Sequence, residues 1–237
     1  MKAKTLLIAV AALAAGVISS QAQVYSQNIV GYANIVTASS AYNYLIEVPF
    51  KIGVSNGANE VFANAPDFTT LLIWNPASSG FSTYQKDGGS PTGWTDGSSP
   101  LSPPVLPVGM GFFLTPGSDN TTNTFAGAIA VTVGTSNVTT FASSAYNYLV
   151  GSPVPYGGSV TNGNNSTGGL NMGSLPDFTT LLLWDPASSG FATVQKDASS
   201  ATGWTDGSSP IAPPSLVVGQ AFFLTPGTDG GQWTVGL

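Results

Sequence analysis

Two copies of one short motif contain the residues of this sequence that are best suited to contact a ligand. The first copy is GWTDGSSP at residues 93–100, and the same eight letters return at residues 203–210. An exposed Trp beside carboxylate and hydroxyl groups suits a sugar-binding loop, because the apolar face of a sugar ring stacks on indole while its hydroxyls need hydrogen-bond partners. The motif therefore predicts contact with carbohydrate.

Charged residues precede each motif and extend this candidate site. The predicted ligand-binding residues, four in each copy, are Trp94, Asp96, Lys86 and Asp87, and Trp204, Asp206, Lys196 and Asp197. A competing interpretation is that each Trp closes one end of a folded domain and that each Asp-Gly pair forms an ordinary turn. The solvent exposure of the two indoles distinguishes these interpretations.

Metal binding and catalysis find little support in the sequence. The repeated loop carboxylates could bind Ca²⁺, but they lack the ordered spacing of a calcium loop, so we predict no metal site. Glu47 and Glu60 are the only glutamates, neither has a counterpart in the second half of the chain, and no Ser-x-x-Lys spacing is present. We therefore expect no catalytic residue and no cofactor, and we expect that the protein is not an enzyme.

The composition excludes several further classes of function. The chain has 237 residues and a formal charge of −6, so most of its surface would repel nucleic acid. It contains no Cys, no His and no Arg, which removes disulfides, thiolate or imidazole metal ligands and bidentate Arg contacts to phosphate. With 42% hydrophobic residues, the chain can still bury a core.

The first 22 residues have the features of a secretory signal peptide. Two lysines precede an apolar, Ala-rich stretch at 5–18, and SQA at 20–22 has the small residues that signal peptidase requires. The apolar stretch is shorter than the roughly 20 residues of a membrane-spanning helix, so we expect export without membrane insertion. Cleavage would leave Gln23 as the first residue and three lysines against eleven acids, a formal charge of −8.

The rest of the chain is a tandem duplication. Residues 38–45 recur without change at 142–149, and residues 66–118 recur at 176–228 with 39 of 53 positions identical. The offset grows from 104 to 110 residues, which places six extra residues in the Gly- and Asn-rich stretch at 157–173. An insertion in such a stretch predicts a surface loop.

The duplication sets the expected domain boundaries. A signal peptide at 1–22 precedes two domains of roughly 100 residues each, at 23–125 and 126–237. A short sequence that resembles the first expected strand occurs at the start, middle and end of the mature chain. We therefore expect the segment 124–133 to close the first domain and to open the second, with no flexible linker between them.

Each domain carries the signals of an all-β fold. Segments rich in β-branched and aromatic residues are separated by Gly, Pro and Asn turns every 8 to 12 residues or so. A hairpin turn is expected at 75–80 and one helical turn at 59–65. We predict two tandem β-sandwich or Greek-key barrel domains, with Trp74 and Trp184 in their cores. Six strands are expected per domain, in the first domain at 29–36, 42–48, 69–74, 81–86, 111–116 and 124–133.

A series of short motifs follows the signal peptide. They are VYSQNIVGY at 24–32, IWNP at 73–76, GW at 93–94, VGMGFF at 108–113 and TFAG at 124–127. This pattern resembles the repeated β-domains of secreted proteins from environmental Verrucomicrobia-like bacteria, and it covers nearly the whole mature chain. The resemblance implies export and a β fold, and it assigns no functional residue.

Two functions fit an exported, acidic, non-enzymatic protein at the cell surface or in the extracellular matrix. The first is binding of polysaccharide or cell-surface glycan through the paired Trp loops, with the duplication raising avidity. The alternative is a structural building block of a surface layer or matrix, in which the first strand, at 24–36, pairs with the open edge of a neighbour. The alternative predicts self-association.

Overall fold

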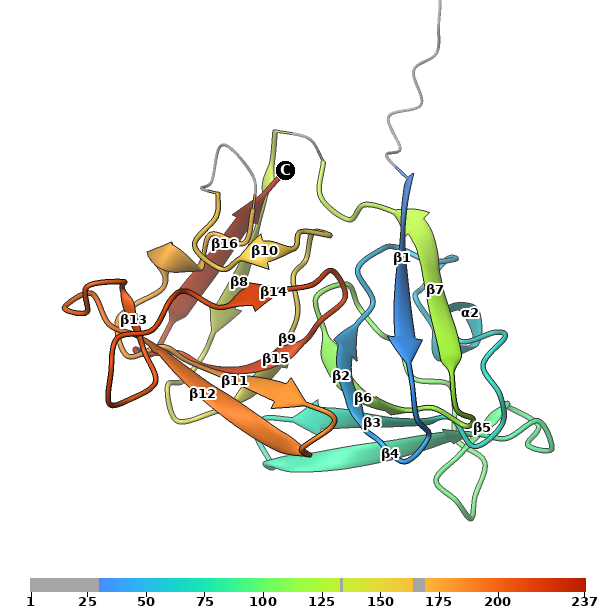
Figure 1. Ribbon diagram of the computed structural model, residues 1–237. Coiled ribbons are helices and arrows are strands. Elements are labelled where there is room, and N and C mark those ends of the chain that lie inside the picture. Colours follow the sequence, from blue (N-terminus) through green and yellow to red (C-terminus); the bar gives the residue numbers. More distant parts are fainter. Residues whose placement is uncertain (1–29, 133, 164–168) are drawn as a thin grey trace, which may run out of the picture.

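The computed structural model describes residues 30–132, 134–163 and 169–237 (Figure 1). The expected signal peptide and its cleavage site lie outside the described residues, as does the start of the expected first strand. Apart from α2 (Ala58–Val61) and the 3-10 turn η1 (Met172–Ser174), the elements are strands. The all-β prediction is confirmed in its β-sandwich form, because the sheets of the described residues do not close into a barrel.

The first domain is a sandwich of a five-stranded and a two-stranded antiparallel sheet. The five-stranded sheet has the order β2-β6-β3-β4-β5, and β1 pairs with β7 in the other. All six expected strands are present, and the two-residue strand β5 is added to them. The strands are β1 (Val30–Thr37), β2 (Tyr44–Glu47), β3 (Thr70–Asn75), β4 (Gly80–Lys86), β5 (Trp94–Thr95), β6 (Gly111–Thr115) and β7 (Thr121–Ala128).

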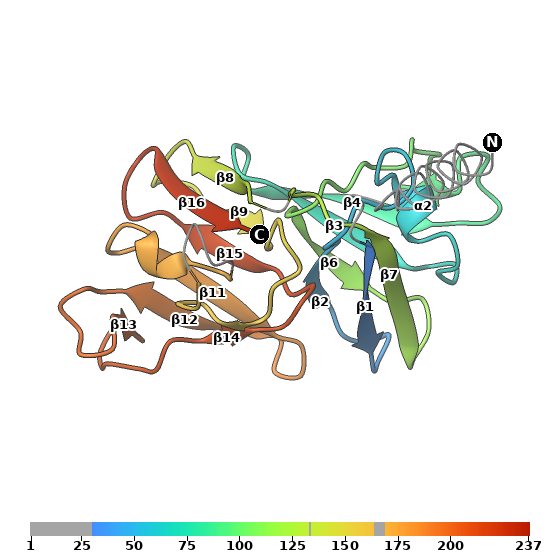
Figure 2. The same cartoon turned by 90° about the horizontal axis from the view of Figure 1, so that it is seen from above.

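The second domain repeats this arrangement. Its five-stranded sheet has the order β13-β12-β11-β15-β9, β16 pairs with β8, and a short extra pair joins β10 to β14. Figure 2 shows the two domains side by side. The strands are β8 (Ser136–Phe141), β9 (Tyr148–Val150), β10 (Gly158–Ser159), β11 (Thr180–Asp185), β12 (Gly190–Lys196), β13 (Trp204–Thr205), β14 (Ser215–Leu216), β15 (Phe222–Thr225) and β16 (Gly231–Gly236).

The expectation that 124–133 serves both domains is wrong. β7 pairs along its whole length with β1, from Thr121 opposite Thr37 to Ala128 opposite Val30. The other edge of β7 bonds to Lys51 of the first domain through Ala128, and no strand of the second domain pairs with β7 in the described residues. That domain opens with its own strand, β8, which pairs with β16. The boundary therefore falls between β7 and β8, and a cut after residue 125 would divide β7.

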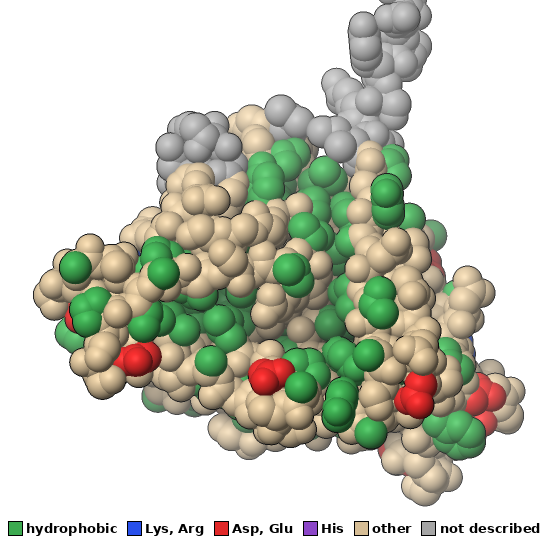
Figure 3. All heavy atoms as spheres, in the orientation of Figure 1, with side chains coloured by type: hydrophobic (Ala, Val, Ile, Leu, Met, Phe, Trp, Pro, Cys, Tyr) green, Lys and Arg blue, Asp and Glu red, His purple; other side chains and the backbone are tan. Residues whose placement is uncertain are grey.

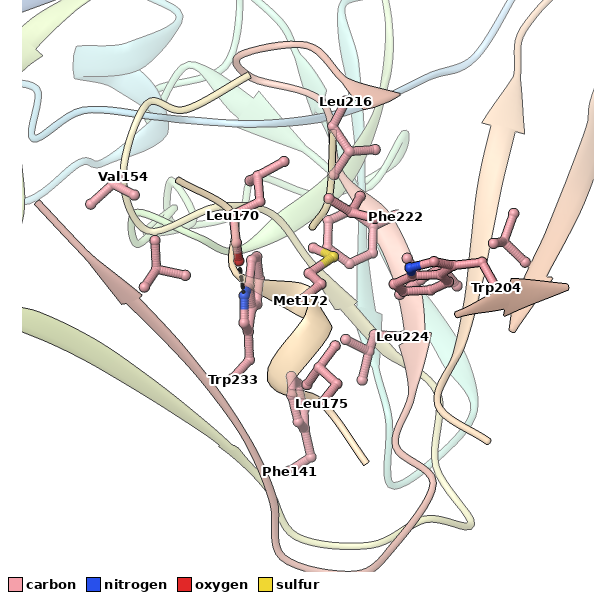
Figure 4. Packing of buried hydrophobic residues seen from close by; sticks show 14 of the residues in the cluster. Phe141, Val154, Leu170, Met172, Leu175, Trp204, Leu216, Phe222, Leu224 and Trp233 are labelled. Atoms are coloured by element: carbon pink, nitrogen blue, oxygen red, sulfur yellow. Dashed lines mark hydrogen bonds between the residues drawn. The ribbon is translucent and has the colours of Figure 1, made fainter. Parts of the chain in front are cut away.

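Each sandwich has its own apolar core. In the first domain, the ring of Phe62 meets Phe112 and Phe125 edge-on, with centroids 6.0 Å apart in both cases. In the second domain, Trp233 packs on Phe222 at 5.8 Å within the cluster shown in Figure 4. Alternate residues of the central strands face these cores, while the residues between them face the other domain.

The second faces of the two five-stranded sheets pack against each other about an approximate two-fold axis. Phe113 and Phe223, which occupy the same repeat position, lie 6.4 Å apart at the centre. Trp74 of the first domain meets Phe223 edge-on at 5.3 Å, and Trp184 of the second meets Phe113 in the same way at 5.2 Å. The two indoles are therefore half-buried between the domains and not inside either core.

Reciprocal hydrogen bonds reinforce this interface. Trp74 Nε1 donates to the carbonyl of Asn147 at 2.7 Å, and Trp184 Nε1 donates to the carbonyl of Asn43 at 2.6 Å. Backbone bonds also join the sheet edges: the N–H of Glu47 donates to a carbonyl of the second domain at 2.9 Å. The domains are thus in direct contact through an apolar layer and a hydrogen-bonded rim.

Candidate functional site

The structure decides between the two interpretations of the motif indoles in favour of burial. The side chain of Trp94 is 0% exposed and that of Trp204 is 1% exposed. Trp94 Nε1 donates to Asn59 Oδ1 at 2.6 Å, and Trp204 lies in the core cluster of the second domain (Figure 4). Neither indole presents a face to solvent, so neither can stack on a sugar ring in this conformation.

The Asp-Gly pairs form turns within their loops. Asp96 Oδ1 accepts hydrogen bonds from the N–H groups of Ser98 and Ser99 at 2.9 and 2.7 Å. These bonds, that from Ser99 first, hold the pKa of the Asp96 carboxyl below its ordinary value. Gly97 follows with φ of 99°, a left-handed conformation that favours glycine. Asp206 makes the same bonds in the second domain, where they also lower its pKa.

The two lysines of the predicted site bond to protein groups. Lys86 Nζ donates to the carbonyls of Phe62 and Ala63 at 2.7 and 3.0 Å, which ties β4 to the segment after α2. Lys196 Nζ instead forms an ion pair with Asp177 Oδ1 at 2.8 Å. Both ammonium groups therefore make structural contacts that hold neighbouring loops in place.

Strand pairing brings the predicted site residues together in each copy. Lys86 lies opposite Trp94 in the β4–β5 pair, and Lys196 lies opposite Trp204 in the second domain. Asp87 accepts a hydrogen bond from the N–H two residues further along, at 2.8 Å. Asp197 does the same at 2.8 Å, and the hydroxyl of Ser199 lowers its pKa. The motif is thus a compact loop with a buried Trp, as the competing interpretation states.

The outer edge of β1 is the second candidate site. Ala128 of β7 exchanges both of its backbone hydrogen bonds with Lys51, at 3.1 and 2.8 Å, so it makes none with β1. The alternation of an antiparallel ladder then directs the N–H and C=O groups of Tyr32, Asn34 and Val36 away from β7. Within the described part of the chain, no strand pairs with this edge of β1.

The side chains on the outer face of β1 are exposed and largely apolar. Val30, Tyr32 and Val36 are 69%, 75% and 63% exposed. β1 contains no charged residue and no proline, which are the usual means by which edge strands block pairing. Ser136 of β8 occupies the position of Tyr32 in the second domain. The apolar edge is therefore a property of the first domain.

A groove runs along β1 between the two domains. It contains a hollow of about 560 Å³ between β1 and the loop that precedes β15, with Trp184 and Val217 among its lining residues. A second hollow of about 400 Å³ shares Asn34 and Val218 with the first. All lining residues are uncharged, and Figure 3 shows apolar side chains along this groove.

Glu47 has no counterpart in the second half of the chain, and this difference between the repeats is the sequence signal for its unusual environment. Its side chain is 1% exposed at the domain interface, where Oε1 accepts a hydrogen bond from the N–H of Ser152 at 2.9 Å. Oε2 has no hydrogen-bond partner among the described residues. Burial raises the pKa of this carboxyl well above its ordinary value. A Cβ at Gly151 would lie 2.3 Å from the Glu47 carboxyl carbon, so the Glu-to-Gly difference between the copies makes room for this side chain.

Metal sites and membrane-spanning helices are not found in the described ranges. These ranges hold no cluster of three or more acidic side chains that could bind a metal ion. Their helices are too short to span a bilayer. Comparison with protein-family models, curated proteins and solved structures finds no match. The functional interpretation therefore depends on the geometry of this chain.

Proposed function

We propose that the protein is an exported, non-enzymatic building block of the cell surface or extracellular matrix, which assembles with further copies of itself through the free edge of β1. The observation that carries the proposal is the unpaired outer edge of β1, an uncharged strand on which Val30, Tyr32 and Val36 are exposed. An added strand would pair with the free backbone groups, while the exposed side chains would give selectivity.

The distribution of charge supports a second copy as the partner. After the expected cleavage the chain carries eleven acids and three lysines, so two copies repel each other over most of their surfaces. The groove beside β1 has no charged lining residue, so repulsion is weakest there. A second copy also offers the same uncharged strand for pairing.

The motif loops support this building-block function better than glycan binding. The indoles of Trp94 and Trp204, which were to provide the stacking surfaces, are buried. A tandem domain pair with a shared apolar interface and an open strand edge has the form expected of a repeated structural unit.

Sedimentation velocity of the secreted chain over a wide range of concentration tests the proposal. We expect wild-type protein to form concentration-dependent oligomers and Tyr32→Lys to sediment as a monomer, because a lysine opposes strand pairing. Ser136→Lys is the matched control, since it adds the same charge at the equivalent exposed position of β8. A wild-type protein that is monomeric at every concentration would refute the proposal, as would equal oligomerisation of Tyr32→Lys and wild type.

A further inference from the structure

A pocket of about 280 Å³ lies in the first domain between β7 and the segment that follows α2. Residues 60–65 form one side of it and residues 121–124 the other, with Ile52 and Ala126 completing the lining. Figure 1 shows α2 beside β7, on the side away from β1. The pocket is therefore separate from the groove along the free edge of β1.

Asn123 brings an unpaired hydrogen-bond donor to this pocket. Its side chain is only 9% exposed, and its Nδ2 has no hydrogen-bond partner among the described residues. Buried amide groups in folded proteins are nearly always hydrogen-bonded, because an unpaired donor loses its contacts with water without replacement. Nδ2 is shielded from solvent in this conformation, so a rotation of the amide group toward the pocket would let a ligand oxygen supply the missing acceptor.

The duplicated domain shows what the same position looks like when the space is filled. Asn123 lies opposite Ile35 in the β1–β7 pair, and Trp233 lies opposite Thr139 in the corresponding pair. Trp233 is fully buried, and its Nε1 donates to the carbonyl of Leu170 at 2.6 Å (Figure 4). The second domain thus places a large, hydrogen-bonded ring where the first has a small amide and a pocket.

Charge at the pocket selects against anionic ligands. Glu60 is the only charged residue of its lining. The carboxyl oxygens of Glu60 accept hydrogen bonds from the N–H groups of Val54, Ser55 and Gly57, which lower its pKa to about 2. It is therefore ionised at all physiological pH values and repels phosphates and acidic sugars.

The rest of the lining combines apolar and hydrogen-bonding groups. Val61 and Ala65 present apolar surface and Thr122 carries a hydroxyl group, while the hydroxyl of Thr124 already donates to Asn34 Oδ1 at 2.8 Å. In an antiparallel pair, the backbone groups of alternate residues point away from the partner strand. On β7 the N–H and C=O groups of Thr122 and Thr124 therefore point away from β1 and toward the pocket side. A sugar ring has matching properties, since it combines C–H surface with hydroxyls that both donate and accept.

We infer that this pocket binds a neutral, polyhydroxylated ligand of the size of one sugar ring, with Asn123 Nδ2 donating to a ligand oxygen. The pocket and the free edge of β1 lie on opposite sides of the β1–β7 pair, so this binding does not require assembly.

Protein-observed NMR titration of the secreted chain tests the inference. The neutral probes are glucose, galactose, mannose and N-acetylglucosamine, and the anionic probes are glucuronic acid and glucose 6-phosphate. We expect at least one neutral sugar to shift the side-chain amide signal of Asn123, with anionic probes at least tenfold weaker because of Glu60. Asn123→Leu removes the donor at similar volume and is expected to weaken binding at least tenfold.

Two more variants complete the experiment. Asn123→Trp copies the second domain and is expected to abolish binding by filling the pocket. Asn137→Leu, at an exposed position of β8, is the control and is expected to leave affinity unchanged. If Asn123→Trp does not fold, Asn123→Leu alone decides. The inference is overturned if no neutral probe shifts the Asn123 amide, if Asn123→Leu binds as well as wild type, or if anionic probes bind equally well.

Discussion

Replacement of Phe223 by Ala probes the contact between the two domains. The Phe223 side chain is 7% exposed, and its ring lies 5.3 Å from Trp74, 6.4 Å from Phe113 and 5.7 Å from Phe191. Truncation of a buried Phe to Ala destabilises a protein by about 3–5 kcal/mol. With three ring contacts at the centre of the interface, we expect Phe223→Ala to lie at the middle of that range, at about 4 kcal/mol.

The neighbouring residue provides the matched control. Phe222 is fully buried, but it faces the core of the second domain and not the interface. Phe222→Ala should therefore cost a similar free energy of unfolding, confined to the second domain. Phe223→Ala should also weaken the first domain, because Trp74 and Phe113 lose their partner across the interface.

Urea denaturation gives the free energy of unfolding, and amide hydrogen exchange in β6 reports on the first domain. We expect Phe223→Ala to lower the protection of β6 amides and Phe222→Ala to leave it nearly unchanged. A loss below about 1 kcal/mol for Phe223→Ala, or equal effects of the two variants on β6, would show that the domains do not pack through this face.

Three further outcomes are expected. Trp94→Ala and Trp204→Ala should each cost about 3–5 kcal/mol in thermal melts, and unchanged melting would contradict their burial. The raised pKa of Glu47 means that the folded state keeps its proton longer than the unfolded state, so wild-type stability falls as pH rises from the unfolded pKa through the folded one. Glu47→Gln should remove this fall and be the more stable protein at neutral pH; parallel pH profiles in urea melts would refute the assignment. Intact mass of the exported protein should show Gln23 as its first residue, and retention of residues 1–22 would refute the export hypothesis.

Local patterns were sufficient to predict the six longer strands of the first domain, but not the two-residue strand β5. The alternating and β-branched runs that became β1, β3 and β4 are decided by neighbouring residues, and so is the turn at 75–80. The shared-strand expectation failed because it rested on a short similarity that is unrelated to pairing. Only the ladder register shows that β7 is already occupied on one edge by β1.

The candidate site was harder to predict because burial is a property of the whole fold. The sequence GWTDGSSP is compatible with either an open sugar-binding loop or a closed turn with a buried Trp. The closed turn is found, because the Trp94 indole N–H donates a hydrogen bond to the side chain of Asn59, a residue distant in the sequence. The Glu47-to-Gly151 difference is visible in the repeat, but its meaning requires the domain interface. That Asn123 and Trp233 occupy equivalent positions becomes visible only when the registers of the β1–β7 and β8–β16 pairs are compared.

Hydrogen exchange along β1 as a function of protein concentration tests assembly through this strand most directly. The amides of Gly31, Ala33 and Ile35 face β7 and should be protected at every concentration. Those of Tyr32, Asn34 and Val36 face the free edge, so we expect them to exchange rapidly in dilute monomer and to become protected as oligomers form. Rapid exchange of Tyr32, Asn34 and Val36 within a sedimenting oligomer would contradict the proposed assembly.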